Sequence, residues 1–461
     1  MSVPQFKVMQ HAPALVAACL LLWGGSAAAQ SAGEVEFSRG VGFAQSPGQV
    51  PRVLGKGLPL REGDRLTTAE GASAIIRLAD GTRMTVRPNS EIVLRQYQFK
   101  ENTPEGNSML MDLLRGGLRA ITGGISKSSP NAARIQTNTA TIGIRGTDFD
   151  VRVCGQECGA ESARVQERGR PNQVQASARM AGVQGEVNAV DGAGARRRLV
   201  DGGSVYPGEV IETGANTRAV VAFRDDTRVT LGASTRFRVD NFVFDEKNPG
   251  EGRFLASVLR GTMRALTGLI GKANTRNVGF ATATATVGIR GTGLDIVCTG
   301  ACAGEPPVGN ESGLTLFTWL GSIVVTQQGQ TALQVLQAGQ GLFISPTGMT
   351  PISTQPPQID IQRPDQITVP ANLFTTQSVP DNAEGVFVFV RDGHIEVTTS
   401  REVLQLGRNE TGFANPNGLT ARPLEIPKHI EFDRVVLPST RNPALVSVLS
   451  DAGIRQSNVC R

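Results

Sequence analysis

Four cysteines are the residues of this chain whose spacing most directly suggests chemistry. They form two C-x-x-x-C pairs, Cys154 with Cys158 and Cys298 with Cys302. Such cysteines can close a local disulfide, or four of them can hold a metal ion. No histidine neighbours them in the sequence, and each pair belongs to a different copy of a repeat. We therefore expect two local disulfides, of modest stabilising effect because the ring is small, and no metal site.

A repeated core, T-A-T-[IV]-G-I-R-G-T, precedes each cysteine pair. Glycines flank the central arginine of each copy, Arg145 and Arg290, and permit a sharp change of backbone direction. The arginine could bind an anion or a partner through its planar guanidinium. It could instead fix the turn through an internal ion pair, which we favour. The candidate site residues of this core turn are Gly143, Arg145, Gly146, Thr147, Gly288, Arg290, Gly291 and Thr292.

The ion-pair interpretation names partners for each arginine. In the first copy the candidates are Asp148 and Asp80, and in the second they are Asp295 and Asp225. Both Asp80 and Asp225 open a D-x-T-R motif, which is typical of a hairpin turn.

The repeat extends well beyond the core. Arg145 and Arg290 stand 145 residues apart, and the D-x-T-R and L-R-G motifs keep the same offset. A period of this length indicates a duplicated domain and not a solenoid unit. Gly116 and Gly261 of the L-R-G motifs are expected at β-bulges or close approaches of the backbone.

Composition and periodicity predict an all-β fold. The chain has 54 glycines, only 39% hydrophobic residues, and short segments that alternate apolar and polar positions. We expect two tandem short-stranded β domains, each a sandwich, a roll or a short solenoid-like array, followed by a small C-terminal β unit. The apolar residues of 108–122 suit either a helix or two strands broken at Gly116-Gly117, and the glycines favour the two strands. Residues 385–399 are expected to form a hairpin around Asp392-Gly393.

Five segments are expected along the chain. They are a signal peptide (1–29), a first domain (33–176), a second domain (177–349), a Pro/Gln/Thr-rich linker (350–380) and a C-terminal β unit with a tail (381–461). The apolar run of residues 14–23 is too short to span a bilayer and precedes an A-x-A cleavage site. A lipoprotein site at Cys19 is the less favoured alternative. Cys460 is either free or pairs between chains.

Catalytic motifs are not found. The three histidines, His11, His394 and His429, lie in no recognised catalytic frame, and no glycine-rich loop opens a helix. The net charge of +5 comes from interspersed residues, and the basic run 196–198 lies in a turn. The sequence therefore predicts a protein that is not an enzyme, that needs no cofactor and that does not bind nucleic acid.

The two copies resemble the FecR domain. The resemblance rests on Asp80–Arg83, on the L-R-G segments and on the A-T-x-G-[IV]-R-G-T cores, and spans roughly residues 33 to 350. It implies a mainly β module of the cell envelope that senses a signal or contacts a protein. The namesake regulators carry a cytoplasmic anti-sigma segment and a membrane span, which we do not find in this sequence.

A periplasmic or secreted protein-interaction or signal-sensing module is therefore expected, with an envelope protein as partner. The alternative is a module that binds envelope glycan, such as peptidoglycan. The low aromatic content, 5% of residues, disfavours it because sugar sites use exposed aromatic rings.

Overall fold

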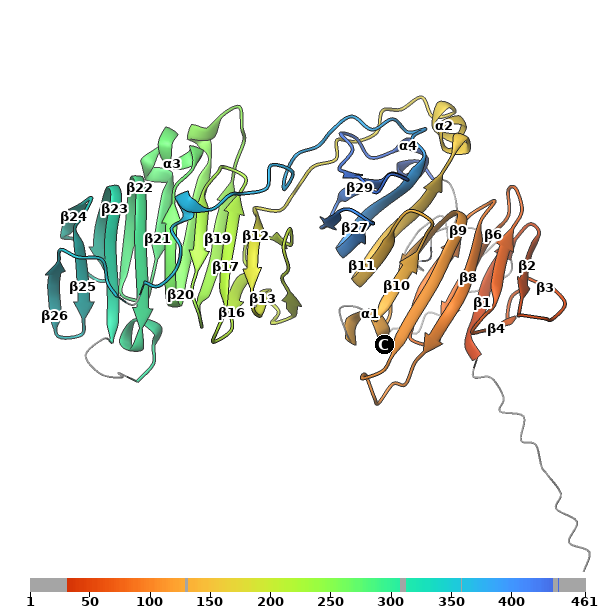
Figure 1. Cartoon of the computed structure of the whole chain (residues 1–461), viewed down its shortest axis with the longest axis horizontal. Coiled ribbons are helices and arrows are strands. Elements are labelled where there is room, and N and C mark those ends of the chain that lie inside the picture. The colour runs from red at the N-terminus through yellow and green to blue at the C-terminus, as the bar shows by residue number, and fades with distance from the viewer. Residues whose placement is uncertain (1–30, 129–131, 307–311, 358, 434–437, 439–461) are drawn as a thin grey trace, which may run out of the picture. The chain divides into compact units, whose positions relative to one another are not determined.

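The computed structural model describes residues 31–438 apart from 129–131, 307–311, 358 and 434–437 (Figure 1). These residues form two sheets of 15 strands each, which confirms the predicted all-β class. Among them, no helix is long and apolar enough to cross a membrane. The predicted signal peptide with Cys19, and Cys460, lie outside the described residues.

The first sheet takes its strands from both ends of the described chain. They are β1 (Ser31–Arg39), β2 (Gly42–Gln45), β3 (Arg52–Val53), β4 (Pro59–Arg61), β5 (Arg65–Thr68), β6 (Ser73–Leu78), β7 (Arg83–Val86), β8 (Glu91–Gln98), β9 (Ser108–Ile121), β10 (Ala133–Gln136), β11 (Thr141–Cys154), β27 (Gly385–Thr398), β28 (Val403–Leu406), β29 (Glu410–Ala414) and β30 (Thr420–Ala421).

The second sheet is built from one continuous stretch of chain. Its strands are β12 (Ala178–Gln184), β13 (Val187–Val190), β14 (Arg196–Arg198), β15 (Ser204–Val205), β16 (Val210–Thr213), β17 (Arg218–Phe223), β18 (Arg228–Leu231), β19 (Arg236–Val243), β20 (Arg253–Leu266), β21 (Val278–Ala281), β22 (Ala285–Thr299), β23 (Gly313–Gln327), β24 (Leu333–Gln337), β25 (Gly341–Ser345) and β26 (Gly348–Ile352).

Short helices connect the strands. They are α1 (Ile125–Ser128), α2 (Gln156–Ala163), α3 (Leu269–Ala273), α4 (Lys428–Glu431), and the 3₁₀ turns η1 (Pro249–Glu251), η2 (Thr275–Asn277), η3 (Gly300–Ala303) and η5 (Pro364–Gln366).

The second sheet is inserted into the first. Strand β27 pairs with β11 from Thr398 opposite Thr141 to Gly385 opposite Cys154. This pairing is the counterpart of β23 beside β22. Strands β27–β30 therefore complete the first sheet, and the predicted independent C-terminal β unit is wrong. The blue C-terminal strands in Figure 1 accordingly lie beside the orange and yellow first sheet.

Long bent strands let each sheet fold over its own core. In β9, residues 108–115 pair with β8, whereas residues 116–121 pair with β11. Ser108–Ile121 thus form one bent strand, and the predicted break into two strands at Gly116-Gly117 is wrong. Residues 385–398 are likewise one strand, β27, and the predicted hairpin at Asp392-Gly393 is wrong, because pairing with β11 continues on both sides of Gly393. Each sheet encloses its own buried apolar cluster.

Candidate functional site

Glycines bend the long strands at the same three places in both sheets. In the first sheet these are Gly116, Gly146 and Gly393, with φ of 74°, 59° and 90°. In the second sheet Gly261, Gly291 and Gly321 also have positive φ. A β-carbon on Gly116 would lie 2.3 Å from Ser90 Oγ, so the predicted close approach is confirmed there. The G-I-R-G-T core is therefore a bend within a strand and does not end it.

The threonine of the core joins three strands. The Thr147 N–H donates to Thr122 Oγ1 at 2.8 Å, and the Thr147 hydroxyl donates to the His394 carbonyl oxygen at 3.0 Å. Thr292 makes the two equivalent hydrogen bonds at 2.9 and 2.7 Å. Since the bend interrupts the regular ladder, these bonds satisfy backbone groups that would otherwise be buried without partners. This part of the core has a structural role.

Arg145 pairs with Glu396 of β27, with Nη2 and Oε2 3.6 Å apart. The predicted pairing with Asp148 or Asp80 is wrong, because Asp148 instead binds Arg119 at 3.0 Å. Burial lowers the pKa of Arg145, although the Glu396 carboxylate opposes that shift. Among the described residues, Arg145 Nε has no hydrogen-bond partner. The arginine is thus half-buried and held loosely by one carboxylate.

The predicted ion pair of Arg290 with Asp295 or Asp225 stays a prediction. The side chain of Arg290 lies outside what the structure describes. Asp295 binds Arg264 through Nε at 2.8 Å and accepts a hydrogen bond from Trp319 Nε1 at 2.9 Å. Burial raises the pKa of Asp295 to about 6, even though the Arg264 guanidinium opposes the shift. This carboxylate is a buried structural group.

The D-x-T-R motifs form a buried clamp. Asp80 accepts hydrogen bonds from the Thr82 N–H at 3.1 Å, the Thr82 hydroxyl at 2.9 Å and the Ile125 N–H at 3.2 Å. Asp225 binds Thr227 at the same two distances. The predicted hairpin turn is confirmed by the pairing of β6 with β7. The aspartate also ties that turn to the start of α1.

The sequence difference at Asp148, which is Gly293 in the second copy, has a steric cause. A β-carbon on Gly293 would lie 2.4 Å from the Trp319 ring. Trp319 occupies the position that Arg391 has in the first sheet, as the strand registers show. Arg391 donates to the buried Asp150 at 2.8 Å, as Trp319 does to the equivalent Asp295. Gly293 and Trp319 of the second sheet thus stand where the first sheet has the charged residues Asp148 and Arg391.

Both predicted disulfides are present, Cys154–Cys158 and Cys298–Cys302. Each joins the end of a long strand to the short helical turn that follows it, α2 or η3. The local pairing follows from the spacing, because the second cysteine returns beside the first within one helical turn.

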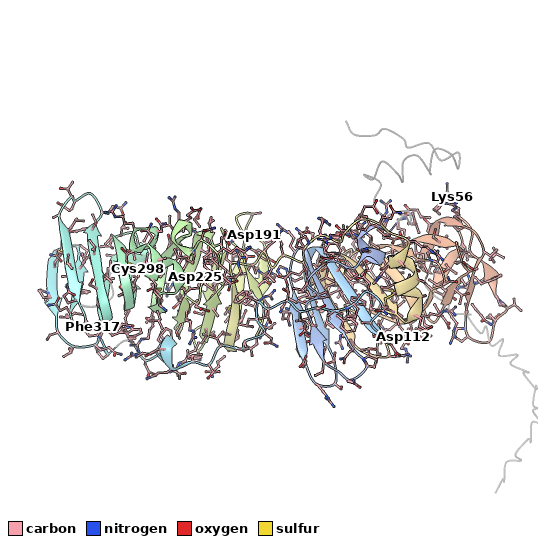
Figure 2. The ribbon with its side chains drawn as sticks, turned by 90° about the horizontal axis from the view of Figure 1, so that it is seen from above. Lys56, Asp112, Asp191, Asp225, Cys298 and Phe317 are labelled. Atoms are coloured by element: carbon pink, nitrogen blue, oxygen red, sulfur yellow. A yellow bond between two sulfur atoms is a disulfide. The ribbon has the colours of Figure 1, made fainter. Side chains whose placement is uncertain are left out.

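The two disulfides lie on opposite faces of equivalent strands. In the strand register Cys154 corresponds to Thr299, whereas Cys298 corresponds to Val153. A shift of one residue turns a side chain to the other face of a sheet. Cys298 therefore belongs to the main core of the second sheet, where Figure 2 labels it. Cys154 lies in a separate cluster on the outer face of the first sheet, with Phe387.

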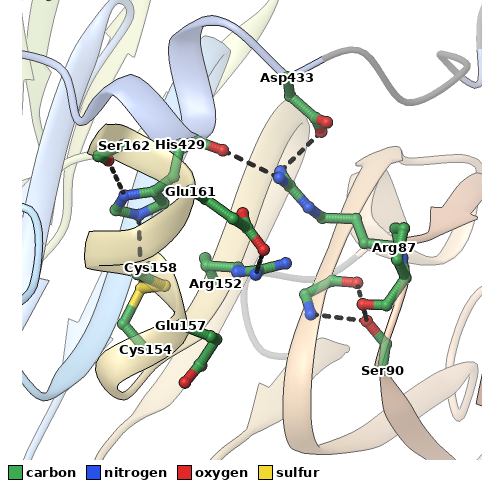
Figure 3. Close-up of polar contacts among 12 residues, drawn as sticks. Arg87, Ser90, Arg152, Cys154, Glu157, Cys158, Glu161, Ser162, His429 and Asp433 are labelled. Carbon is green, nitrogen blue, oxygen red and sulfur yellow. Dashed lines mark hydrogen bonds and ion pairs between the residues drawn. A yellow bond between two sulfur atoms is a disulfide. The ribbon is translucent and has the colours of Figure 1, made fainter. Parts of the chain in front are cut away.

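A buried histidine packs against the first disulfide (Figure 3). His429 Nε2 lies 3.4 Å from Cys154 Sγ, and its Nδ1 lies 3.2 Å from Ser162 Oγ. Burial lowers the pKa of His429 to about 3, and the nearby Arg152 lowers it further. The imidazole and the two sulfurs are close enough to share a metal ion, but the sulfurs are bonded to each other as a disulfide and offer no thiolate.

A charged cluster seals one edge of the first sheet. Glu410 is fully buried between Arg179 of β12 and Arg422, and its Oε1 accepts from Arg179 Nη2 at 2.6 Å. The same two arginines donate to the backbone oxygen of Gln405 in edge strand β28, at 3.1 and 2.8 Å. Because guanidinium groups cap the edge carbonyl, no further strand can add there.

The equivalent edge of the second sheet is apolar, and none of the described residues covers it. Glu396 and Gln405 of the first sheet, which are hydrogen-bonded to each other, correspond to Val324 and Val335. Val335 is 49% exposed and Leu333, two residues before it on β24, is 66% exposed. We name the surface formed by Val324, Leu333 and Val335 the β24 edge.

The architecture is that of a duplicated all-β protein whose repeated motifs build strand bends and buried clamps. Two segments match the family model described as FecR protein, residues 64–167 and 209–302. The chain therefore contains two FecR segments, as the sequence predicted.

Other comparisons add little. No curated protein matches this chain. Two solved structures described as "a putative anti-sigma factor" from Parabacteroides distasonis are similar at 15% identity and a TM-score of 0.24. Each match covers 31% of this chain and 59% of the other, so the chain spans less than two thirds of those relatives.

Proposed function

We propose that this protein is an exported, non-catalytic protein-interaction or signal-sensing module of the cell envelope. The observation that carries the proposal is the β24 edge. An exposed apolar edge strand is a template on which another chain can add a strand. The same edge is polar and sealed in the first sheet, so the fold does not require it to be apolar.

The remaining chemistry supports a binding role. The two disulfides suit an oxidising compartment outside the cytoplasm. The buried titratable groups Asp150, Asp295 and His429 are each engaged by neighbouring side chains. We propose no cofactor and no reaction.

A second copy of the chain cannot seal the β24 edge as β12 seals the β28 edge. The seal at β28 depends on the guanidinium of Arg179 in β12. The equivalent residue of β1 is Glu34, whose carboxylate cannot donate the same hydrogen bonds.

A glycan partner has less support. Sugar binding needs exposed aromatic rings. Of the exposed apolar side chains among the described residues, only Phe43 is aromatic, and it is 39% exposed. The Trp319 ring is covered by Arg363, whose guanidinium carbon lies 4.1 Å from the ring centroid.

Site-specific photo-cross-linking in intact cells tests the proposal. A photoreactive residue at Leu333 or Val335 should capture one and the same envelope protein. The matched control is Val403, the exposed counterpart of Leu333 on β28. Capture from Leu333 should be lost in a Val324→Glu/Val335→Gln chain, which carries the first sheet's residues at these two positions. Equal capture at Val403, no capture at β24, or retention of the chain on purified peptidoglycan at moderate salt would each count against it.

A further inference from the structure

The first sheet covers its outer face with its own chain. The segment after the last strand places Ile426, just before helix α4, and Ile430, within α4, against Cys154, Phe387 and Phe413 in one buried cluster. The two isoleucines lie four residues apart, and the extended Pro427 between them starts the helical turn that brings Ile430 to the same cluster. The His429 ring, which lies between them in the sequence, stacks edge-on against Phe387 at 5.2 Å.

Within the part of the chain that the structure describes, no such helix lies over the equivalent positions of the second sheet. Cys154, Phe387 and Phe413 correspond in strand register to Thr299, Thr315 and Phe343. These three residues are only partly buried. They line a hollow of about 390 Å³, together with Val297, Ile352 and Pro356. That volume falls within the range of roughly 300–1,000 Å³ that is usual for ligand sites.

The segment after β26 covers only one side of this hollow. Ile359 and Ile361 pack on Val297, and the Ile361 carbonyl oxygen accepts from Arg264 at 3.0 Å. These contacts leave Thr315 and Phe343 facing the open part. The one-residue shift of the cysteine accounts for the opening, since it moves the disulfide from this outer face into the core and leaves a threonine in its place.

We propose that this hollow binds a short amphipathic segment of a partner protein, inserting two aliphatic side chains spaced four residues apart. The first sheet is the template, because the same face there accepts Ile426 and Ile430. The residues that line the hollow carry no charge, and their methyl, aromatic and proline groups favour apolar side chains over a sugar. The inference rests on the proposed function, that the chain binds a protein. It adds the place of binding, the hollow, and the groups that are recognised, two aliphatic side chains.

A synthetic fluorescent peptide of the chain's own residues 422–433 (RPLEIPKHIEFD) is the probe, with the full mature chain as receptor. We expect saturable binding by fluorescence anisotropy. Thr315→Arg and Phe343→Ala should each weaken it at least about tenfold, because a charge or a lost ring at the contact costs more than about 1.4 kcal/mol. A peptide in which both isoleucines are replaced by aspartate should not bind.

Phe43→Ala, on the first sheet, is the matched control and should leave binding unchanged. Thr299→Arg is the second variant, should Thr315→Arg fail to fold by circular dichroism. No saturable binding, or binding that these substitutions do not weaken, overturns the proposal. So does self-association that the substitutions abolish, which assigns the hollow to a second copy, or preferential binding of a soluble peptidoglycan fragment. A chain that cross-links through the β24 edge but does not bind the peptide would reject the hollow alone.

Discussion

The first and second sheets share one strand order but differ in what lies on their outer faces. The first carries its disulfide, α2 and α4 on that face, and two arginines seal its β28 edge. The second has its disulfide in the core, an open hollow above Thr315 and an apolar β24 edge. The difference teaches that a duplicated fold can keep its interior while its surfaces diverge.

The interior is kept because it is geometrically demanding. Strand bends need glycine, and buried backbone groups need the core threonine, so these residues recur in both copies. Surface positions have no such requirement. A valine can replace a glutamate at the β24 edge without disturbing the bend beside it.

The largest expected effect comes from the sealed edge. Glu410→Gln should lower the free energy of unfolding by about 3–5 kcal/mol, because it leaves Arg179 and Arg422 buried without a counter-charge. The equivalent residue of the second sheet is the exposed Gln340, and Gln340→Ala should change stability by less than about 0.5 kcal/mol. Urea unfolding measures both. Similar effects at the two positions would remove the distinction between a sealed and an open edge.

The next effect depends on pH and concerns Asp295. Its pKa of about 6 in the folded chain lies above the ordinary 3.8, so the folded state binds more protons between these values. This carboxyl therefore favours folding most below about pH 4, and its contribution declines by roughly 3 kcal/mol as pH rises through 6. Asp295→Asn should remove that decline.

Fluorescence of Trp319 during urea unfolding at pH 4 and pH 7 measures it, because Trp319 is the one tryptophan of the chain outside residues 1–29. His429 has the opposite sign, since its pKa is lowered to about 3 and its contribution is lost as pH falls below 6.5. An identical pH dependence in the wild-type and Asp295→Asn chains would contradict the assignment.

Removal of either disulfide should lower the free energy of unfolding by a similar amount, but should loosen a different part of its sheet. Removing either small ring should cost about 2 kcal/mol in the chain-entropy account. Cys154→Ala/Cys158→Ala should speed hydrogen exchange in α2 and α4, which cover an outer face. Cys298→Ala/Cys302→Ala should speed it in β20 and β22, which surround the core. Mass spectrometry of exchanged peptides locates the change, and the same pattern in both variants would refute the opposite-face arrangement.

The smallest effect separates two glycines of one core. Gly146→Ala should cost about 1–2 kcal/mol, because its φ of 59° is unfavourable for any residue with a β-carbon. Gly143→Ala should be tolerated, since an added β-carbon would meet Glu396 Cβ at an ordinary 3.7 Å. Thermal unfolding compares the two variants. If both variants lost the same stability, steric crowding of an added β-carbon, and not the positive φ at the bend, would explain the glycines of this motif.

Local rules explain which predictions succeeded. The alternation of apolar and polar residues identified the strands. Each cysteine has its disulfide partner only four residues away in the sequence, so the pairing could be predicted. The D-x-T-R turns were also readable, because a turn is made by neighbouring residues. Arg145 was harder, since several carboxylates could serve it and the chosen one, Glu396, lies in a distant segment.

The sequence by itself determined the duplication, the β class and the local disulfides. The duplication shows when two stretches of sequence are compared, and the strands and disulfides depend on residues close together in the chain. Only the tertiary structure decided that β27 completes the first sheet, and that His429 reaches Cys154. Strand pairing is made by backbone N–H and C=O groups, which are the same in nearly every residue. The sequence therefore does not mark which distant strands pair. The tertiary structure also decided which face each disulfide takes, since a strand reverses its face with every residue and the register is set by its partner.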